Sequence, residues 1–184
     1  MQKNHGAWQV AAFIFTSILG TFLHFLFDLT GENLVAGMFS AVNESTWEHM
    51  KLIFYPMVLF AIIEWNYIGR KTPGYWCIKL TGLLLALIMI PVIYYTYTGI
   101  LGTSADWFNI AIFFIAAGAA YWTQYKMLTN DVKCPLGSAE SVVIMIIIFA
   151  LFTFFTFNPP HIPLFKDPIS GKYGFFQINY CLAK

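Results

Sequence analysis

Imidazole and carboxylate side chains recur at the ends of the apolar segments of this chain, in a pattern suited to binding a metal ion. His24 lies within an apolar run and precedes Asp28 by four residues, so a helix places both side chains on one face. An ionisable residue within a membrane segment usually faces the protein interior or a wet cavity, which makes it a functional candidate. Divalent metals such as zinc bind imidazole and carboxylate groups. The candidate metal ligands are His24, Asp28, His49 and His161.

Glu44 and Glu48 flank the start of the next apolar run and are the candidate catalytic carboxylates. A bound metal ion turns water into a nucleophile that attacks an ester, amide or phosphoester, and a nearby carboxylate acts as general base. Ser45 to Glu48 also matches the S-x-x-E capping box, in which Ser45 caps a helix and Glu48 hydrogen-bonds the Ser45 amide. Glu48 therefore has a structural explanation that Glu44 and His49 lack. The chain has no HExxH motif, and its candidate ligands come from three separate segments.

The composition indicates which elements must hold these residues. Hydrophobic residues make up 59% of the 184 residues and charged residues 10%, against roughly half and a quarter in soluble domains. A soluble fold of this length cannot bury so much apolar surface, so we predict an all-α integral membrane protein in a lipid bilayer. The net charge of +1 provides no basic field for nucleic acid. Three cysteines without a CxxC motif indicate neither a disulfide framework nor a zinc finger.

Five apolar segments are long enough for transmembrane helices, which need about 20 residues each. The predicted spans are residues 6–27, 46–69, 80–101, 107–125 and 141–157. Residues 34–42 are apolar but too short to span, so the first loop is predicted to be re-entrant or interfacial. Prolines exclude a sixth helix in residues 158–184, which are predicted to form a lid with a short hairpin. Residues 1–184 thus form a single transmembrane domain.

The distribution of Lys and Arg orients the bundle, because these residues are enriched on the cytoplasmic side of a membrane. The end with the N-terminus holds Lys3, Arg70, Lys71, Lys79, Lys126 and Lys133, and the other end holds Lys51, Lys166, Lys172 and Lys184. We therefore predict that the N-terminus is inside and the C-terminus outside the cytoplasmic membrane. Glu64, near the inner end, is predicted to be structural and to reach towards Arg70 or Lys71.

The predicted spans place the candidate residues in one layer at the outer end of the bundle. His24 ends the first span, His49 begins the second, and His161 follows the fifth on a proline-stiffened arm. Side chains at equal depth on neighbouring helices can meet. We predict that His24, Asp28 and His49 line one cavity, with Glu44 or Glu48 at its edge and His161 above it. The alternative is that His24 and Asp28 only satisfy each other by a hydrogen bond at a helix end.

Two strings are the most distinctive parts of the chain, SAVNESTWEHMKLIFYP at residues 40–56 and NPPHIPLFKDPISGKYG at residues 158–174. They resemble those of an uncharacterised family of small multi-pass membrane proteins of Gram-positive anaerobic bacteria, and the resemblance covers most of the chain. It implies a bacterial cytoplasmic membrane and supplies no activity, substrate or cofactor.

Three functions fit these observations. The first is a membrane-embedded hydrolase or transferase that uses a divalent metal such as zinc to act on a lipid headgroup or another small molecule at the outer face. The alternative is a protein that binds or transports a small molecule or a cation through the same acidic, aromatic-rimmed pocket. A third possibility is an accessory subunit whose polar outer face contacts a partner. Three histidines at the outer end favour the metal-dependent enzyme.

Overall fold

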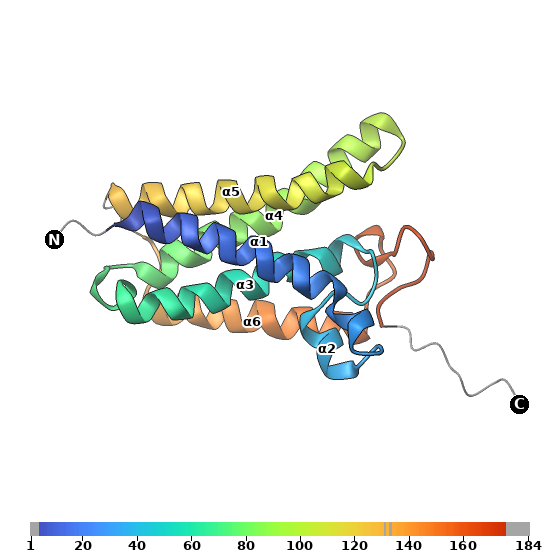
Figure 1. Cartoon of the computed structure of the whole chain (residues 1–184), viewed down its shortest axis with the longest axis horizontal. Helices are drawn as coiled ribbons and strands as arrows, with labels where there is room; N and C mark the ends of the chain where they lie inside the picture. The colour runs from blue at the N-terminus through green and yellow to red at the C-terminus, as the bar shows by residue number, and fades with distance from the viewer. Residues whose placement is uncertain (1–3, 131, 133, 176–184) are drawn as a thin grey trace, which may run out of the picture.

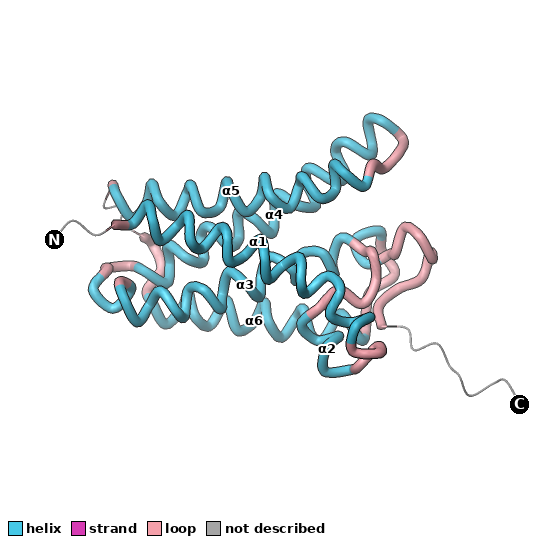
Figure 2. The backbone as a smooth tube through the Cα atoms, viewed as in Figure 1, coloured by secondary structure: helices cyan, strands magenta, loops and turns pink. Residues whose placement is uncertain are grey.

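The computed structural model describes residues 4–130, 132 and 134–175, and this part of the chain consists mostly of helices joined by loops (Figure 2). Five long helices and one short helix account for most of it. They are α1 (His5–Leu29), α2 (Leu34–Phe39), α3 (Thr46–Tyr67), α4 (Tyr75–Leu101), α5 (Asp106–Thr129) and α6 (Ser138–Phe157). Two single 3₁₀ turns, η1 (Gly69–Lys71) and η2 (Pro163–Phe165), follow α3 and α6. The five long helices coincide with the five predicted apolar segments.

The long helices run alternately up and down along one axis (Figure 1). α1 packs against α3 and α5, α4 packs against α5, α3 and α6, and the turn between α4 and α5 leans away from the other helices. Because the helices alternate in direction, α1 ends and α3 begins at the same end of the bundle. The short helix α2 and the segment after α6 lie at that end as well (Figure 1).

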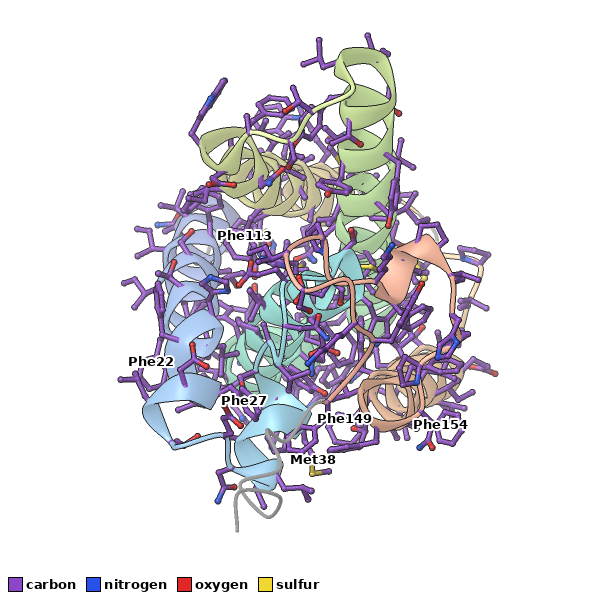
Figure 3. The ribbon with its side chains drawn as sticks, turned by 90° about the vertical axis from the view of Figure 1, so that its right-hand side faces the viewer. Phe22, Phe27, Met38, Phe113, Phe149 and Phe154 are labelled. Carbon is purple, nitrogen blue, oxygen red and sulfur yellow. A yellow bond between two sulfur atoms is a disulfide. The ribbon has the colours of Figure 1, made fainter. Side chains whose placement is uncertain are left out.

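The side chains of α1 separate into an inner and an outer stripe, as expected for a helix with apolar surroundings on both sides. The inner stripe is buried and consists of Gln9, Ala12, Thr16, Gly20, Leu23 and Phe27. The outer stripe is exposed although it is apolar, and it consists of Val10, Ile14, Ile18, Phe22, Phe25 and Leu29. Viewed from the α2 end, Phe22 points outward from α1 while Phe27 lies on its inner side (Figure 3). An exposed apolar stripe of this kind is typical of a surface that contacts lipid or another protein.

Three of the described helices, α1, α4 and α6, are long and apolar enough to cross a membrane. α3 and α5 are of similar length but carry more charged residues, among them Glu48, Lys51 and Glu64 in α3. These three α3 side chains are all buried in the bundle. The composition of three helices is thus compatible with a membrane protein, and the charged side chains of the more polar helix α3 lie inside the bundle.

Glu64 does not reach towards Arg70 or Lys71 as predicted, because it is fully buried and pairs with Lys79 of α4. Gln9 Nε2 donates to Glu64 Oε1 at 3.0 Å, and Lys79 Nζ donates to Gln124 Oε1 at 2.9 Å. Lys79 therefore belongs to the interior and not to a loop charge at the membrane surface. A charged pair is tolerated in a low-dielectric interior only when its remaining hydrogen-bonding capacity is satisfied, and the two glutamines do this.

Two of the three cysteines form a disulfide, although the sequence indicated no disulfide framework. Cys77 in the first turn of α4 and Cys134 in the connection between α5 and α6 have their Cα atoms 6.0 Å apart. The bridge lies at the end of the bundle that holds the start of α1. The expectation of no disulfide framework was wrong because 57 residues separate the two cysteines and no local motif marks them. The third cysteine, Cys181, lies outside the described residues.

The segment after α6 packs on the bundle. Of the predicted hairpin, the described residues, which end at 175, contain one isolated antiparallel bridge between Lys166 and Tyr173. The ring of Trp47 lies 4.7 Å from those of both Phe152 and Phe165, measured between centroids. Trp47, in the first turn of α3, thus anchors this segment to α3 and α6. The predicted lid continues to residue 184, and residues 176–184 lie outside the described part.

Candidate metal centre

Two imidazoles and one carboxylate meet between the end of α1 and the start of α3. His49 Nε2 lies 3.4 Å from Glu44 Oε2, and His24 Nε2 lies 3.8 Å from Glu44 Oε1. The ring centroids of His24 and His49 are 5.3 Å apart. One ligand atom from each of the three residues lies within 4.8 Å of the others, a spacing at which one metal ion can contact all three.

The close approach of α1 to α3 brings the two histidines together. Gly20 lies one turn before His24 on the same face of α1, and a Cβ atom placed there would come within 2.7 Å of the Leu52 carbonyl oxygen. Only glycine therefore allows the two helix backbones this contact. Since His49 lies one turn before Leu52 on α3, the contact at Gly20 sets the separation of the two imidazoles.

The ring of His49 is oriented by a backbone group. Ser45 caps α3, as the S-x-x-E pattern predicted, with its side chain accepting from the Glu48 amide at 3.4 Å. The Ser45 carbonyl oxygen lies 3.0 Å from His49 Nδ1. A carbonyl can only accept, so Nδ1 is the donor of this bond and Nε2, on the Glu44 side of the ring, is the nitrogen available to a metal. Histidines that bind metals commonly have their second nitrogen held in this way.

Glu44 is held in place by the loop between α2 and α3. Asn43 Oδ1 accepts from the Ser45 amide at 2.8 Å, forming a local turn around Glu44. Asn43 Nδ2 donates to the Gly174 carbonyl at 2.9 Å, which connects this loop to the segment after α6. The prediction placed Glu44 at the edge of the site as a general base, but the structure puts its carboxylate between the two imidazoles, in the position of a ligand.

Glu48 lies away from this group, although it was predicted as a second catalytic carboxylate. It is buried, and its Oε2 pairs with Lys51 Nζ at 2.5 Å. Its Oε1 accepts from the Thr156 hydroxyl at 2.9 Å and its Oε2 from the Val42 amide at 3.2 Å. The reciprocal bond of the capping box, from the Ser45 amide to Glu48, is replaced by the bond to Asn43. Lys51 was counted from the sequence only as a charge at the outer end, although its spacing of three residues from Glu48 on one helix face indicates the pair.

Asp28 and His161, the other two predicted ligands, do not join His24, Glu44 and His49. Asp28 is exposed and acts on His24 electrostatically without forming an ion pair with it among the described contacts. The His161 ring stacks against Tyr173, with centroids 4.6 Å apart, and is exposed. The proline-rich residues that follow α6 therefore place His161 against Tyr173 and not over the three residues of the site.

The three residues are accessible from outside the protein. The exposed fraction of the side chain is 30% for His24, 35% for His49 and 42% for Glu44. Two histidines and one glutamate form the ligand set of many catalytic zinc sites, in which the fourth position is left to water or substrate. The same donors also suit ferrous iron. The arrangement can hold a divalent metal with a coordination position open to the surroundings.

The model of one protein family, described as a family of unknown function (DUF6512), matches residues 1–175. This match agrees with the uncharacterised family expected from the sequence. No curated protein and no solved structure matches the chain. The chemistry of the site therefore has to be argued from its own residues.

Proposed function

We propose that this chain, which belongs to the DUF6512 family, is a multi-pass membrane protein that binds a divalent metal such as zinc through His24, Glu44 and His49. The observation that carries the proposal is the convergence of two imidazoles and a carboxylate, with ligand atoms within 4.8 Å of one another. The ligands come from α1, the loop before α3, and α3, so only the folded bundle brings them together.

The metal would support hydrolysis or group transfer at the level of the lipid headgroups. Three protein ligands would leave a coordination position for a water molecule, and a metal held by them would supply the activation of that water as a nucleophile. The site lies at the end of an apolar bundle and is partly exposed, so an ester, amide or phosphoester group of a lipid or small molecule has access to it. Because Glu48 is paired with Lys51 and Glu44 is a ligand, Asp28 becomes the remaining carboxylate for the role of general base.

We also propose that all five long helices span the cytoplasmic membrane, with the N-terminus inside and the metal site at the outer face. The excess of Lys and Arg at the N-terminal end remains when the buried Lys51 and Lys79 are left out of the count. The Cys77–Cys134 disulfide argues for the opposite orientation, because disulfides persist in oxidising compartments. Accessibility of the two ends to an impermeant reagent decides between these arguments.

A second function, binding or transport of a small molecule or cation, is favoured by features of the opposite end. The Glu64–Lys79 pair lies inside the bundle, and ionisable residues within membrane segments often mark ion or proton pathways. A cavity of about 1390 Å³ opens at the same end of the bundle, lined by Ile78 and Tyr125 among others. Ile78 precedes Lys79 and Tyr125 follows Gln124 in the chain, so the cavity lies near the level of the buried polar groups, although none of them lines it.

Elemental analysis of the detergent-purified protein tests the metal proposal. The wild-type chain is expected to retain one equivalent of a divalent transition metal, and His24→Ala or His49→Ala to lose it. His161→Ala is the matched control, since this exposed histidine lies at the same end but outside the group, and it should keep the metal. A wild-type protein that contains no metal but retains a small molecule would contradict the metal proposal and support the binding function.

A further inference from the structure

A buried ion pair, Lys51 with Glu48, lies on the same turn of α3 as His49 of the candidate metal centre. Lys51 and Glu48 are adjacent on the inner face of α3, and their side chains are 0% and 2% exposed. A buried charge pair of this kind contributes little net stability, because the cost of removing both groups from water offsets their attraction. The groups that the pair contacts therefore indicate what other role it has.

The Lys51 ammonium connects three segments that are distant in the sequence. Lys51 Nζ donates to the Gly37 carbonyl in α2 at 2.9 Å and to the Thr156 hydroxyl in α6 at 2.9 Å, in addition to its bond with Glu48. Thr156 lies next in space to the segment after α6, because its carbonyl oxygen accepts from the Phe175 amide at 2.8 Å. All three donor directions of the ammonium are thus used.

Glu48 completes this arrangement on the side of the metal-site loop. Its Oε2 accepts from the Val42 amide at 3.2 Å, two residues before Glu44. Gly37 and Val42 are two of the points at which the α2 segment is tied to α3. A third is the Met38 carbonyl, which accepts from the Tyr55 hydroxyl at 2.8 Å. Glu44 follows Val42 by two residues. The charged pair therefore holds both ends of the short segment that delivers Glu44 to the two histidines.

We propose that Lys51 and Glu48 are positioning residues for the metal centre, acting through Glu44. This inference rests on the proposed metal binding. Glu44 is on a loop, and a loop ligand requires fixed supports if the site is to be formed before the metal arrives. Removal of groups that hold a metal ligand in place typically lowers metal affinity by about 10- to 100-fold, and the pair holds Glu44 through the backbone at Gly37 and Val42.

The test is cobalt(II) affinity of the full chain in detergent, measured from the visible absorption of the bound ion. The variant Glu48→Gln/Lys51→Met removes both charges together, which avoids leaving one buried charge unpaired. It is expected to bind cobalt about 10- to 100-fold more weakly than the wild type while retaining its helix content. Glu64→Gln/Lys79→Met is the matched control, because it removes the buried pair at the opposite end, and its cobalt affinity should equal that of the wild type.

The Glu44→Gln background shows whether the pair acts through Glu44. There, Glu48→Gln/Lys51→Met is expected to lower cobalt affinity no further, since the positioned ligand has already been lost. A loss that persists in this background, or wild-type affinity in the double variant, would overturn the positioning role alone. Absence of cobalt binding by the wild type would instead overturn the proposed metal site, and the positioning role with it.

Discussion

His24 and His49 belong to different helices, yet their ring centroids lie 5.3 Å apart and the carboxylate of Glu44 faces both rings. The pairing depends on the contact of α1 with α3 at Gly20, one turn before His24. It also depends on the cap at Ser45, whose carbonyl orients the His49 ring. A backbone contact and a helix cap thus place two imidazoles side by side at the end of a bundle that is otherwise apolar.

Gly20→Ala should separate α1 from α3 and weaken the site. The added Cβ would meet the Leu52 carbonyl oxygen, a backbone atom that cannot turn aside. Overpacking of this kind costs about 1–3 kcal/mol of unfolding free energy, and cobalt affinity should fall with it. Gly99→Ala in α4 is the control, because nothing lies within 4 Å of its added Cβ. Equal effects of the two substitutions on stability and affinity would contradict the role of the Gly20 contact.

Lys79→Met should destabilise the bundle strongly, because it leaves the Glu64 carboxylate buried without its cation. Removal of one member of a buried pair costs about 3–5 kcal/mol. Adding Glu64→Gln removes the orphaned charge, so the double variant should recover most of this loss. Denaturant unfolding followed by tryptophan fluorescence measures both values. A double variant no more stable than Lys79→Met would show that the pair is not the cause.

The orientation of the bundle can be measured with single cysteines in a cysteine-free background. Ile169→Cys lies at the end with the metal site and Asn130→Cys at the opposite end, and both positions are exposed. An impermeant maleimide on intact cells should label Ile169→Cys, and should label Asn130→Cys only after lysis. The reverse pattern would invert the proposed orientation and place the Cys77–Cys134 disulfide outside.

Hydrolysis should depend on the metal if the site is catalytic. Detergent-solubilised protein is expected to cleave a generic ester or phosphoester probe, to lose this activity with a chelator, and to regain it with zinc. Glu44→Gln should reduce the rate even at saturating zinc, whereas His161→Ala should not. A wild-type chain that holds zinc at this site but cleaves neither kind of probe would favour metal or cation binding over catalysis.

The positions of the long helices could be predicted from the sequence, and so could the placement of His24 and His49 at the same end of the bundle. Each long helix is an apolar run of about 20 residues, and alternation of direction brings the end of α1 and the start of α3 to one end of the bundle. His24 and His49 were therefore expected at the same depth. Their lateral contact follows from the glycine at position 20, whose meaning becomes clear only when its neighbour on α3 is known.

The partners of the charged residues could not be predicted. Lys79 was expected at a membrane surface and Glu64 was expected to reach towards Arg70 or Lys71, because hydropathy treats each charge separately and does not reveal that two of them meet inside. Likewise, Glu48 fits a local capping pattern, but its carboxylate pairs with Lys51 and does not accept from the Ser45 amide, which donates to Asn43. The direction of the arm bearing His161 depends on packing against Tyr173, which a run of prolines does not specify.

X-ray absorption spectroscopy at the zinc edge tests the central claim most directly, because it reports the atoms bound to the metal. For the zinc-loaded chain in detergent, two imidazole ligands together with oxygen donors are expected, at about 2.0–2.2 Å from the ion. His24→Ala should remove one imidazole contribution, and His161→Ala should leave the spectrum unchanged. A zinc ion surrounded by sulfur or by oxygen alone, or a spectrum that His24→Ala does not alter, would contradict a metal centre formed by His24, Glu44 and His49.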